Sequence, residues 1–236
     1  MACVLIPVVA AGAVAVVLVL RLWIVCRSQD VTPRESLSLL VVAGSGGHTT
    51  EILRLLGSLS SAYSPRHYVI ADTDKMSADK INSFELDRAD RDPSTMFLQI
   101  YSAPVNKAVR EHSAVMDSRY YIHRIPRSRE VQQSWLSTVL TTLHSMWLSF
   151  PLIHQVKPDL VLCNGPGTCV PICIAALLLG ILGIKKVIIV YVESICRVET
   201  LSLSGKILIH LSDYFIVQWP TLKEKYPRSV YLGRIV

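Results

Sequence analysis

The chain has 236 residues, of which 51% are hydrophobic, and its 24 Lys and Arg against 18 Asp and Glu give a formal net charge of +6. This length suits one domain, alone or with an appendage. The basic excess is mild and forms no stripe interleaved with aromatic residues, which argues against a nucleic-acid-binding protein.

The first element in chain order is an apolar segment. Ala2–Leu20 contains no charged side chain, and the run Leu22–Cys26 continues it after Arg21. Because about 20 apolar residues span a bilayer core, residues 1–27 are predicted to form a transmembrane anchor. A cleaved signal peptide is the alternative, but it would want a basic start and a shorter apolar core. Arg21 and Arg27 follow the run, so the positive-inside rule predicts a cytosolic body.

Charge and cysteine usage agree with a cytosolic domain at a membrane. Without residues 1–27, which hold two Arg and no acid, the net charge falls from +6 to +4, and this excess suits a domain lying against an anionic leaflet. The cysteines show no paired spacing and are expected to be reduced. Cys163, Cys169 and Cys173 lack CxxC spacing and lie in apolar runs, so we expect buried thiols and no metal site.

After a polar linker over 28–36, predicted strands alternate with predicted helices through residues 37–236. This alternation predicts right-handed βαβ units and a parallel, doubly wound, Rossmann-like α/β sheet. Strands are expected at about Leu37–Ala43, His67–Ala71, Tyr120–Ile125, Leu160–Cys163, Val187–Val192, Tyr214–Gln218 and Val230–Leu232. Helices are expected at about Thr49–Leu59, Lys75–Leu86, Gln132–Gln155, Val170–Leu182 and Ser204–Leu211.

Two segments leave alternatives open. Asp87–Arg119 shows no clear period, and within it residues 96–119 are either a loop that meets the acceptor or the membrane, or an insertion peculiar to this form of the protein, which we favour. In the Gln132–Gln155 helix, Pro151 is expected to break or kink the helix. Exposed apolar residues of this helix could touch membrane, and packing on the sheet is the favoured alternative.

A glycine-rich turn follows the first predicted strand and comprises Gly44, Ser45, Gly46, Gly47 and His48. Glycines permit a positive φ and a close approach, and free N–H groups at a helix start attract anionic oxygen, so this turn, with Thr49, predicts a diphosphate site. A tight turn without a ligand is the structural alternative.

Three ligand-binding motifs compete for this turn. A dinucleotide fingerprint would need a third glycine where Thr49 stands, although Asp72 and Asp74 lie roughly where a ribose-binding acid belongs. An ATPase phosphate loop would need a lysine, which is absent. The third is the acceptor-side loop of a glycosyltransferase, in which His48 points into a cleft.

Two further polar turns follow predicted strands. Asn164, Gly165, Pro166, Gly167 and Thr168 follow the fourth strand, and Glu193 and Ser194 follow the fifth. Because the carboxyl ends of parallel strands meet at one edge of a sheet, all three turns are expected to form a single site. Its donors would be backbone N–H groups, Asn164, Thr168 and Ser194, and its possible bases are His48 and Glu193.

These motifs resemble the membrane subunit of the eukaryotic UDP-N-acetylglucosamine transferase. The resemblance rests on the glycine-rich turn behind an apolar segment, Ile125–Val131, Asn164–Thr168 and Tyr191–Ser194, and it covers nearly the whole chain. The family departs from this sequence around Met96–Arg119, which is much shorter in its members. Its two-subunit enzyme adds the second sugar to the dolichol-linked oligosaccharide precursor. The resemblance therefore implies the acceptor half of a GT-B glycosyltransferase, with no metal or other cofactor.

The resemblance also implies a partner and a location. A small cytosolic catalytic subunit would carry the UDP-GlcNAc half, and this chain would recruit it to the endoplasmic reticulum membrane as a single-pass protein facing the cytosol. The apolar tail 230–236 is the expected docking element, through Tyr231, Leu232, Ile235 and Val236. Packing of the tail on its own domain is the alternative.

In the implied reaction, His48 either takes the proton of the acceptor hydroxyl or orients the acceptor's diphosphate, and Glu193 is the rival base. The Gly44–Gly47 amides would hold that diphosphate. Two other classes stay open: a non-catalytic membrane scaffold with a vestigial Rossmann domain, and a membrane-bound NAD(P)-linked oxidoreductase, which the missing third glycine disfavours.

Overall fold

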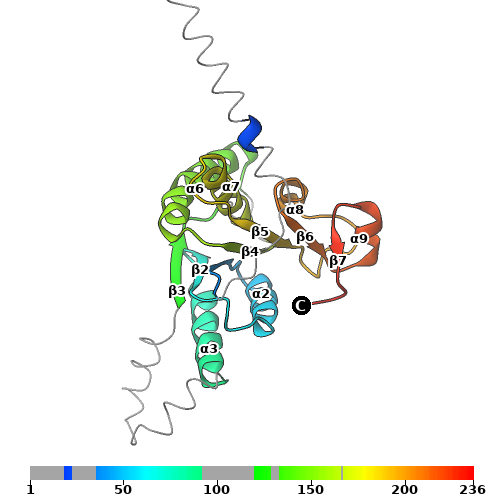
Figure 1. Cartoon of the computed structure of the whole chain (residues 1–236). Helices are drawn as coiled ribbons and strands as arrows, with labels where there is room; N and C mark the ends of the chain where they lie inside the picture. Colours follow the sequence, from blue (N-terminus) through cyan, green and yellow to red (C-terminus); the bar gives the residue numbers. More distant parts are fainter. Residues whose placement is uncertain (1–18, 23–35, 92–119, 129–132, 166) are drawn as a thin grey trace, which may run out of the picture.

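The computed structural model describes residues 19–22, 36–91, 120–128, 133–165 and 167–236. A seven-stranded parallel sheet in the order β3-β2-β1-β4-β5-β6-β7 forms its centre (Figure 1). The strands are β1 Leu39–Val42, β2 Arg66–Ala71, β3 Tyr120–Ile125, β4 Leu160–Asn164, β5 Ile188–Val192, β6 Tyr214–Val217 and β7 Val230–Tyr231. The helices are α2 Gly47–Gly57, α3 Lys75–Arg91, α6 Trp135–Val156, α7 Cys169–Ile181, α8 Leu203–Leu208 and α9 Pro220–Lys225.

Alternate residues of the central strand β1 point to opposite faces of the sheet, and each face has its own core. Leu39 and Val41 pack in a core with residues of α2 and α3. Leu40 and Val42 pack in a second core with residues of α6, α7, α8 and α9. All four are fully buried, which explains why this strand is continuously apolar. Helices thus cover both faces, as a doubly wound sheet requires.

The predicted Rossmann-like sheet is confirmed, and the predicted strands and helices are present with ends displaced by a few residues. Helix α9 was not predicted, because its six residues bury only Leu222 and so show no apolar period. Pro151 lies inside α6 and does not end it, so the break is absent and the kink, the other predicted effect, stays a prediction. Pro151 and Trp147, whose carbonyl loses its donor, are both exposed, so solvent can replace the missing hydrogen bond.

Most of the predicted anchor lies outside the described residues. Residues 19–22 are described and are helical, with the Arg21 guanidinium against Gly183. The predicted linker is described only at Ser36, and the segment 96–119 lies outside the described residues. Within the described ranges, no helix combines the length and the apolar character needed to cross a bilayer.

The direction of strand order reverses between β1 and β4. From β1 the chain proceeds outward through β2 to β3, then returns to pair β4 with the other side of β1, and continues outward through β5. Loops that follow adjacent strands at such a reversal diverge and leave a crevice at the carboxyl edge. The parallel pairings confirm that the turns after β1, β4 and β5 share this edge.

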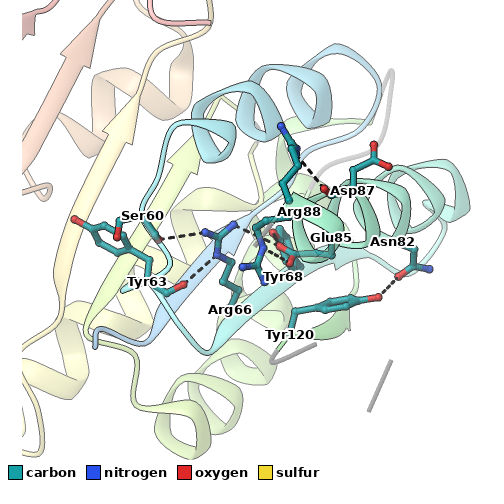
Figure 2. A network of polar contacts seen from close by, with 10 residues as sticks. Ser60, Tyr63, Arg66, Tyr68, Asn82, Glu85, Asp87, Arg88 and Tyr120 are labelled. Carbon is teal, nitrogen blue, oxygen red and sulfur yellow. Dashed lines mark hydrogen bonds and ion pairs between the residues drawn. The ribbon is translucent and has the colours of Figure 1, made fainter. Parts of the chain in front are cut away.

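A buried polar cluster lies near the amino end of β2, under α3 (Figure 2). One carboxylate oxygen of Glu85 lies 3.6 Å from the Arg66 guanidinium and accepts a hydrogen bond from Tyr68, and the other accepts from Arg88 at 2.7 Å. Arg66 also donates to the carbonyl of Tyr63 at 3.0 Å. Glu85 and Arg66 are both buried, so each supplies the partner that burial of the other requires.

Candidate functional site

A pocket of about 310 Å³ opens at the carboxyl edge of the sheet. It is lined by Gly47, His48, Glu51, Gly165, Glu193, Ser194, Cys196, Arg197 and Ser202. The lining comes from the first turns of α2, from the turn after β4 and from the segment between β5 and α8. Pockets that hold small ligands start at about 300 Å³, so this volume admits part of a substrate.

The glycine-rich turn presents backbone N–H groups at the rim of the pocket. Gly46 is the N-cap of α2 with φ 63°, a conformation that favours glycine, and no side chain caps the helix. Ser45, Gly46 and Gly47 are exposed, whereas Gly44 is buried at the strand end. The first N–H groups of a helix have no intrahelical partner, so those of α2 are available to an anion.

The Thr49 side chain, predicted to bind phosphate, faces away from the pocket. It is fully buried, and its hydroxyl contacts the Gly44 carbonyl and lies 2.6 Å from the Ser77 hydroxyl. Its position on α2 places it on the inner face of the helix, so the hydroxyl holds the turn in shape and cannot contact a ligand. Asp74, considered as a ribose-binding acid, instead caps α3 by accepting from Ser77 N at 3.0 Å and Oγ at 2.6 Å.

Four side chains from three parts of the chain form a continuous hydrogen-bonded row at the pocket. His48 Nδ1 lies 3.2 Å from Asn164 Oδ1. Asn164 Nδ2 donates to Glu51 Oε2 at 2.9 Å and to the Val192 carbonyl at 3.4 Å. Ser194 Oγ donates to Glu51 Oε1 at 2.9 Å. The row brings together three predicted site residues, His48, Asn164 and Ser194.

Glu51 joins these residues and was missed by the sequence analysis. It is only 9% exposed although it carries a carboxylate. The available signal was its spacing: three residues after His48 on a helix, a side chain lies on the same face. Its partners lie in distant parts of the sequence, so the spacing alone did not distinguish it from a surface acid.

Gly165 lies directly against the His48 ring. Its φ is 71°, and a Cβ added there would lie 2.5 Å from His48 Cε1, so only glycine fits. Gly167 and Thr168 follow at the start of α7, where Thr168 is the N-cap without a side-chain cap bond. Neither belongs to the lining of the pocket, and the ligand-binding role of both residues stays a prediction.

Glu193 also reaches the pocket, but fixed donors occupy its carboxylate. Oε2 accepts from Ser202 N at 3.1 Å and Ser202 Oγ at 3.0 Å, and Oε1 accepts from Ser194 N at 3.2 Å. Burial raises the pKa of Glu193, while the hydrogen bonds from Ser202 and Ser194 oppose that rise. This geometry suits a carboxylate that holds the turn after β5, and its role as a base stays a prediction.

The predicted docking tail is divided between two environments. Tyr231 and Leu232 are 41% and 60% exposed. Ile235 packs against the core on the α2 side of the sheet, and its N–H donates to Gln218 Oε1 at 3.3 Å. Val236 is half-buried. Part of the tail therefore packs on its own domain, and part is open to a partner.

Three buried thiols lie in the core where α7 packs on β4. Cys163 Sγ is 3.5 Å from Cys173 Sγ, and burial raises the pKa of the Cys163 thiol. These thiols, with Cys169, belong to the core on the α7 side. Across the described residues, no group of three His, Cys, Asp or Glu side chains could hold a metal ion.

Comparison with known proteins agrees with the resemblance seen in the motifs. The family model "Oligosaccharide biosynthesis protein Alg14 like" matches residues 39–235. UDP-N-acetylglucosamine transferase subunit ALG14 of Homo sapiens is 80% identical over 236 residues, which is all of both chains. The protein of that name from Yarrowia lipolytica is 39% identical over 97% of each chain. The crystal structure of MurG from Acinetobacter baumannii is similar with a TM-score of 0.48 and 15% identity, over 78% of this chain and 42% of that chain. This chain therefore belongs to the Alg14-like family of oligosaccharide biosynthesis proteins.

Proposed function

We propose that this chain is the acceptor-side subunit of a two-chain GT-B glycosyltransferase, which adds the second GlcNAc to dolichyl-diphosphate-GlcNAc in N-glycan precursor synthesis. The name shared by its relatives, UDP-N-acetylglucosamine transferase subunit, supports the reaction class and the need for a second chain. One observation carries the proposal: the amino end of α2, which no side chain caps, and His48 lie together at one pocket on the carboxyl edge of the sheet.

The chemistry follows from that juxtaposition. The acceptor's diphosphate would lie on the amides of Gly46 and Gly47 at the start of α2. The attacking hydroxyl would then approach His48, which takes its proton as the new glycosidic bond forms and UDP departs with the electrons of the broken bond. Glu193 is the rival base. The UDP-GlcNAc-binding half would come from a small cytosolic partner.

Radiolabelled GlcNAc transfer from UDP-GlcNAc to a dolichyl-diphosphate-GlcNAc analogue tests this function. We expect product when chain and partner are combined, and none from either alone. Product from this chain alone, or none from the assembled pair, would contradict the proposal.

The alternative is a non-catalytic scaffold that only recruits the partner. The exposed Tyr231 and Leu232 would serve either function. His48→Ala separates them, because a general base contributes about 10²–10⁴-fold to rate whereas a scaffold would lose nothing. Binding of the partner must stay normal in this variant for the comparison to count.

Partner docking through the tail is a separate part of the proposal. Leu232→Asp places a charge on the most exposed apolar side chain of the tail, so the partner should no longer co-purify. Met76→Asp is the matched control, since Met76 is 65% exposed on α3, far along the chain from the tail. Equal retention of the partner by both variants would exclude the tail as the docking element.

Attachment to the endoplasmic reticulum membrane, with the domain in the cytosol, completes the proposal. The apolar run over 1–27 supports it, and so does a row of exposed apolar residues along α6, among which Trp147 is 78% exposed. Val139 and Leu143 lie one turn apart on the same row. Removal of residues 1–27 should release the chain from microsomes on carbonate extraction, and Trp147→Asp should weaken any remaining association.

A further inference from the structure

We infer that Glu51 and Asn164 are positioning residues that fix the His48 imidazole in its Nδ1–H tautomer, leaving the Nε2 lone pair for the substrate. This inference deepens the proposed function, on which its catalytic meaning rests. Glu51 acts on His48 only through Asn164, with which it shares a hydrogen bond of 2.9 Å.

The orientation of the Asn164 side-chain amide is the first step. Its nitrogen faces Glu51 Oε2 at 2.9 Å and the Val192 carbonyl oxygen at 3.4 Å. A backbone carbonyl and a carboxylate accept hydrogen bonds and do not donate them, so neither could face the amide oxygen favourably. The network therefore decides which atom of this amide is oxygen and turns Oδ1 toward His48.

The tautomer of His48 follows from that oxygen. An amide oxygen accepts only, so His48 Nδ1, 3.2 Å from Asn164 Oδ1, must carry the hydrogen. In a neutral imidazole the other nitrogen, Nε2, then has the free lone pair. Gly165 fixes the ring from a second side, because the ring lies where a Cβ of residue 165 would stand. Orientation and tautomer are thus both set before substrate binds.

Glu51 is itself held in place. Ser194 Oγ donates to its Oε1 at 2.9 Å, and Ser194 Oγ in turn accepts from Cys196 N at 3.3 Å. Asn164 is fully buried and Ser194 nearly so, which shields both donors from solvent and strengthens their hydrogen bonds to Glu51. With both oxygens engaged, the carboxylate cannot rotate away from Asn164 without losing a bond to Ser194.

The tautomer can be measured without reference to activity. We would label histidine with ¹³C and ¹⁵N in the full chain bound to its partner, and identify His48 among the seven histidines by its loss in His48→Ala. At a pH where the imidazole is neutral, native His48 should show the Nδ1–H pattern of ring shifts. In Glu51→Ala the Asn164 amide nitrogen loses its 2.9 Å hydrogen bond and keeps only the longer one to the Val192 carbonyl at 3.4 Å, so part of the population should turn and His48 should show a mixture of tautomers.

Glu51→Gln is the conservative control. Its amide oxygen can still accept from Asn164 and its nitrogen can donate to Ser194 Oγ, so the Nδ1–H pattern should persist. If Glu51→Ala does not fold, Ser194→Ala removes one support of Glu51 and should give a smaller fraction of the second tautomer. A native Nε2–H pattern, or an unchanged pattern in a folded Glu51→Ala protein, would overturn the inference.

GlcNAc transfer then reports what the tautomer is for. Glu51→Ala should lower kcat by about 10–100-fold, as removal of a side chain that orients a metal-binding histidine does, with KM for UDP-GlcNAc unchanged. Glu51→Gln should recover most of that activity, and Arg54→Ala, an exposed change on the same helix, should lose none. A changed tautomer with normal transfer would keep the positioning role and overturn the role of His48 as base. Lost transfer with an unchanged tautomer would overturn the positioning role alone.

Discussion

Two buried carboxylates, Glu85 and Glu51, lie on helices that cover the same face of the sheet, yet their surroundings differ in kind. Glu85 is met by Arg66 and Arg88. Glu51 is met by an amide and a hydroxyl, from Asn164 and Ser194. Among the described residues Glu51 forms no ion pair, and neither does Glu193.

The difference separates a structural use of a buried acid from a functional one. Cations neutralise the Glu85 charge where it stands, and its cluster lies at the amino end of β2, away from the pocket (Figure 2). The Glu51 carboxylate instead accepts hydrogen bonds from two neutral groups, the Asn164 amide and the Ser194 hydroxyl. The oxygen of that amide is then available to orient His48. A buried acid without a cation, at the edge of a pocket, is therefore the better indication of a site.

Breaking the cation-matched cluster should have the largest effect on stability. Glu85→Leu leaves the buried Arg66 guanidinium without its charge partner, so the free energy of unfolding should fall by about 3–5 kcal/mol. Denaturant unfolding measures the loss, and GlcNAc transfer per folded molecule should be unchanged. The double variant Arg66→Met, Glu85→Leu should recover most of the loss. If Glu85→Leu alone were as stable as the native chain, Glu85 would have no structural role and its contrast with Glu51 would be lost.

Crowding Glu193 should have the next largest effect. A Cβ at Gly205 would lie 2.1 Å from Glu193 Oε2, so Gly205→Ala must displace the carboxylate from Ser202. Overpacking of this kind costs about 1–3 kcal/mol, measurable by thermal unfolding. Gly57→Ala, at a helical position with no atom within 4 Å of the added Cβ, is the matched control and should be as stable as the native chain or up to about 1 kcal/mol more stable. Equal stability of both variants would show that the Glu193 carboxylate can move away from Ser202 without a measurable loss of stability.

Gly165→Ala sharpens the comparison at His48. The residue would adopt a φ of 71°, which costs an L-residue about 1–2 kcal/mol, and would push on the His48 ring. Gly183→Ala, outside the pocket and the tail, has the same backbone strain, with φ 74°, and its added Cβ would meet only the movable end of the Arg21 side chain. Gly165→Ala should lose more stability than the control in denaturant unfolding, because it adds the contact with the His48 ring to the same strain, and only Gly165→Ala should lose GlcNAc transfer. Equal transfer by both variants would show that the position of the His48 ring does not depend on Gly165.

The smallest effect concerns His67 and His123, two neighbouring rings that are only half-buried, so that solvent weakens their electrostatic contribution to stability. Burial and the neighbouring His123 lower the pKa of His67 from 6.5 to about 4. The unfolded chain therefore binds a proton between these values that the folded chain does not, so the free energy of unfolding should fall as pH drops from 6.5 to about 4. His67→Gln should flatten that slope in unfolding titrations and leave the slope above pH 7 alone. An unchanged acid slope would contradict the assignment.

The sheet could be predicted because its signals are local. The third strand was expected at Tyr120–Ile125 and has those bounds, and the shared edge of the three turns follows from parallel pairing alone. The orientation of side chains around the glycine-rich turn depends on distant elements. Thr49 faces Ser77 and Glu51 faces Asn164, contacts that no period in residues 44–57 encodes. Local patterns therefore located the site but not the residues that organise it.

The long sequence separations within the site also set an order for its assembly during synthesis. Glu51 meets its donors across 113 and 143 positions, so α2 leaves the ribosome well before Asn164 and Ser194 exist. Closing loops of this length is entropically costly and slow compared with forming local structure. A nascent chain can therefore complete β1 to β3 while its Glu51 carboxylate is still without partners, and premature termination before Ser194 yields a partial sheet with no pocket.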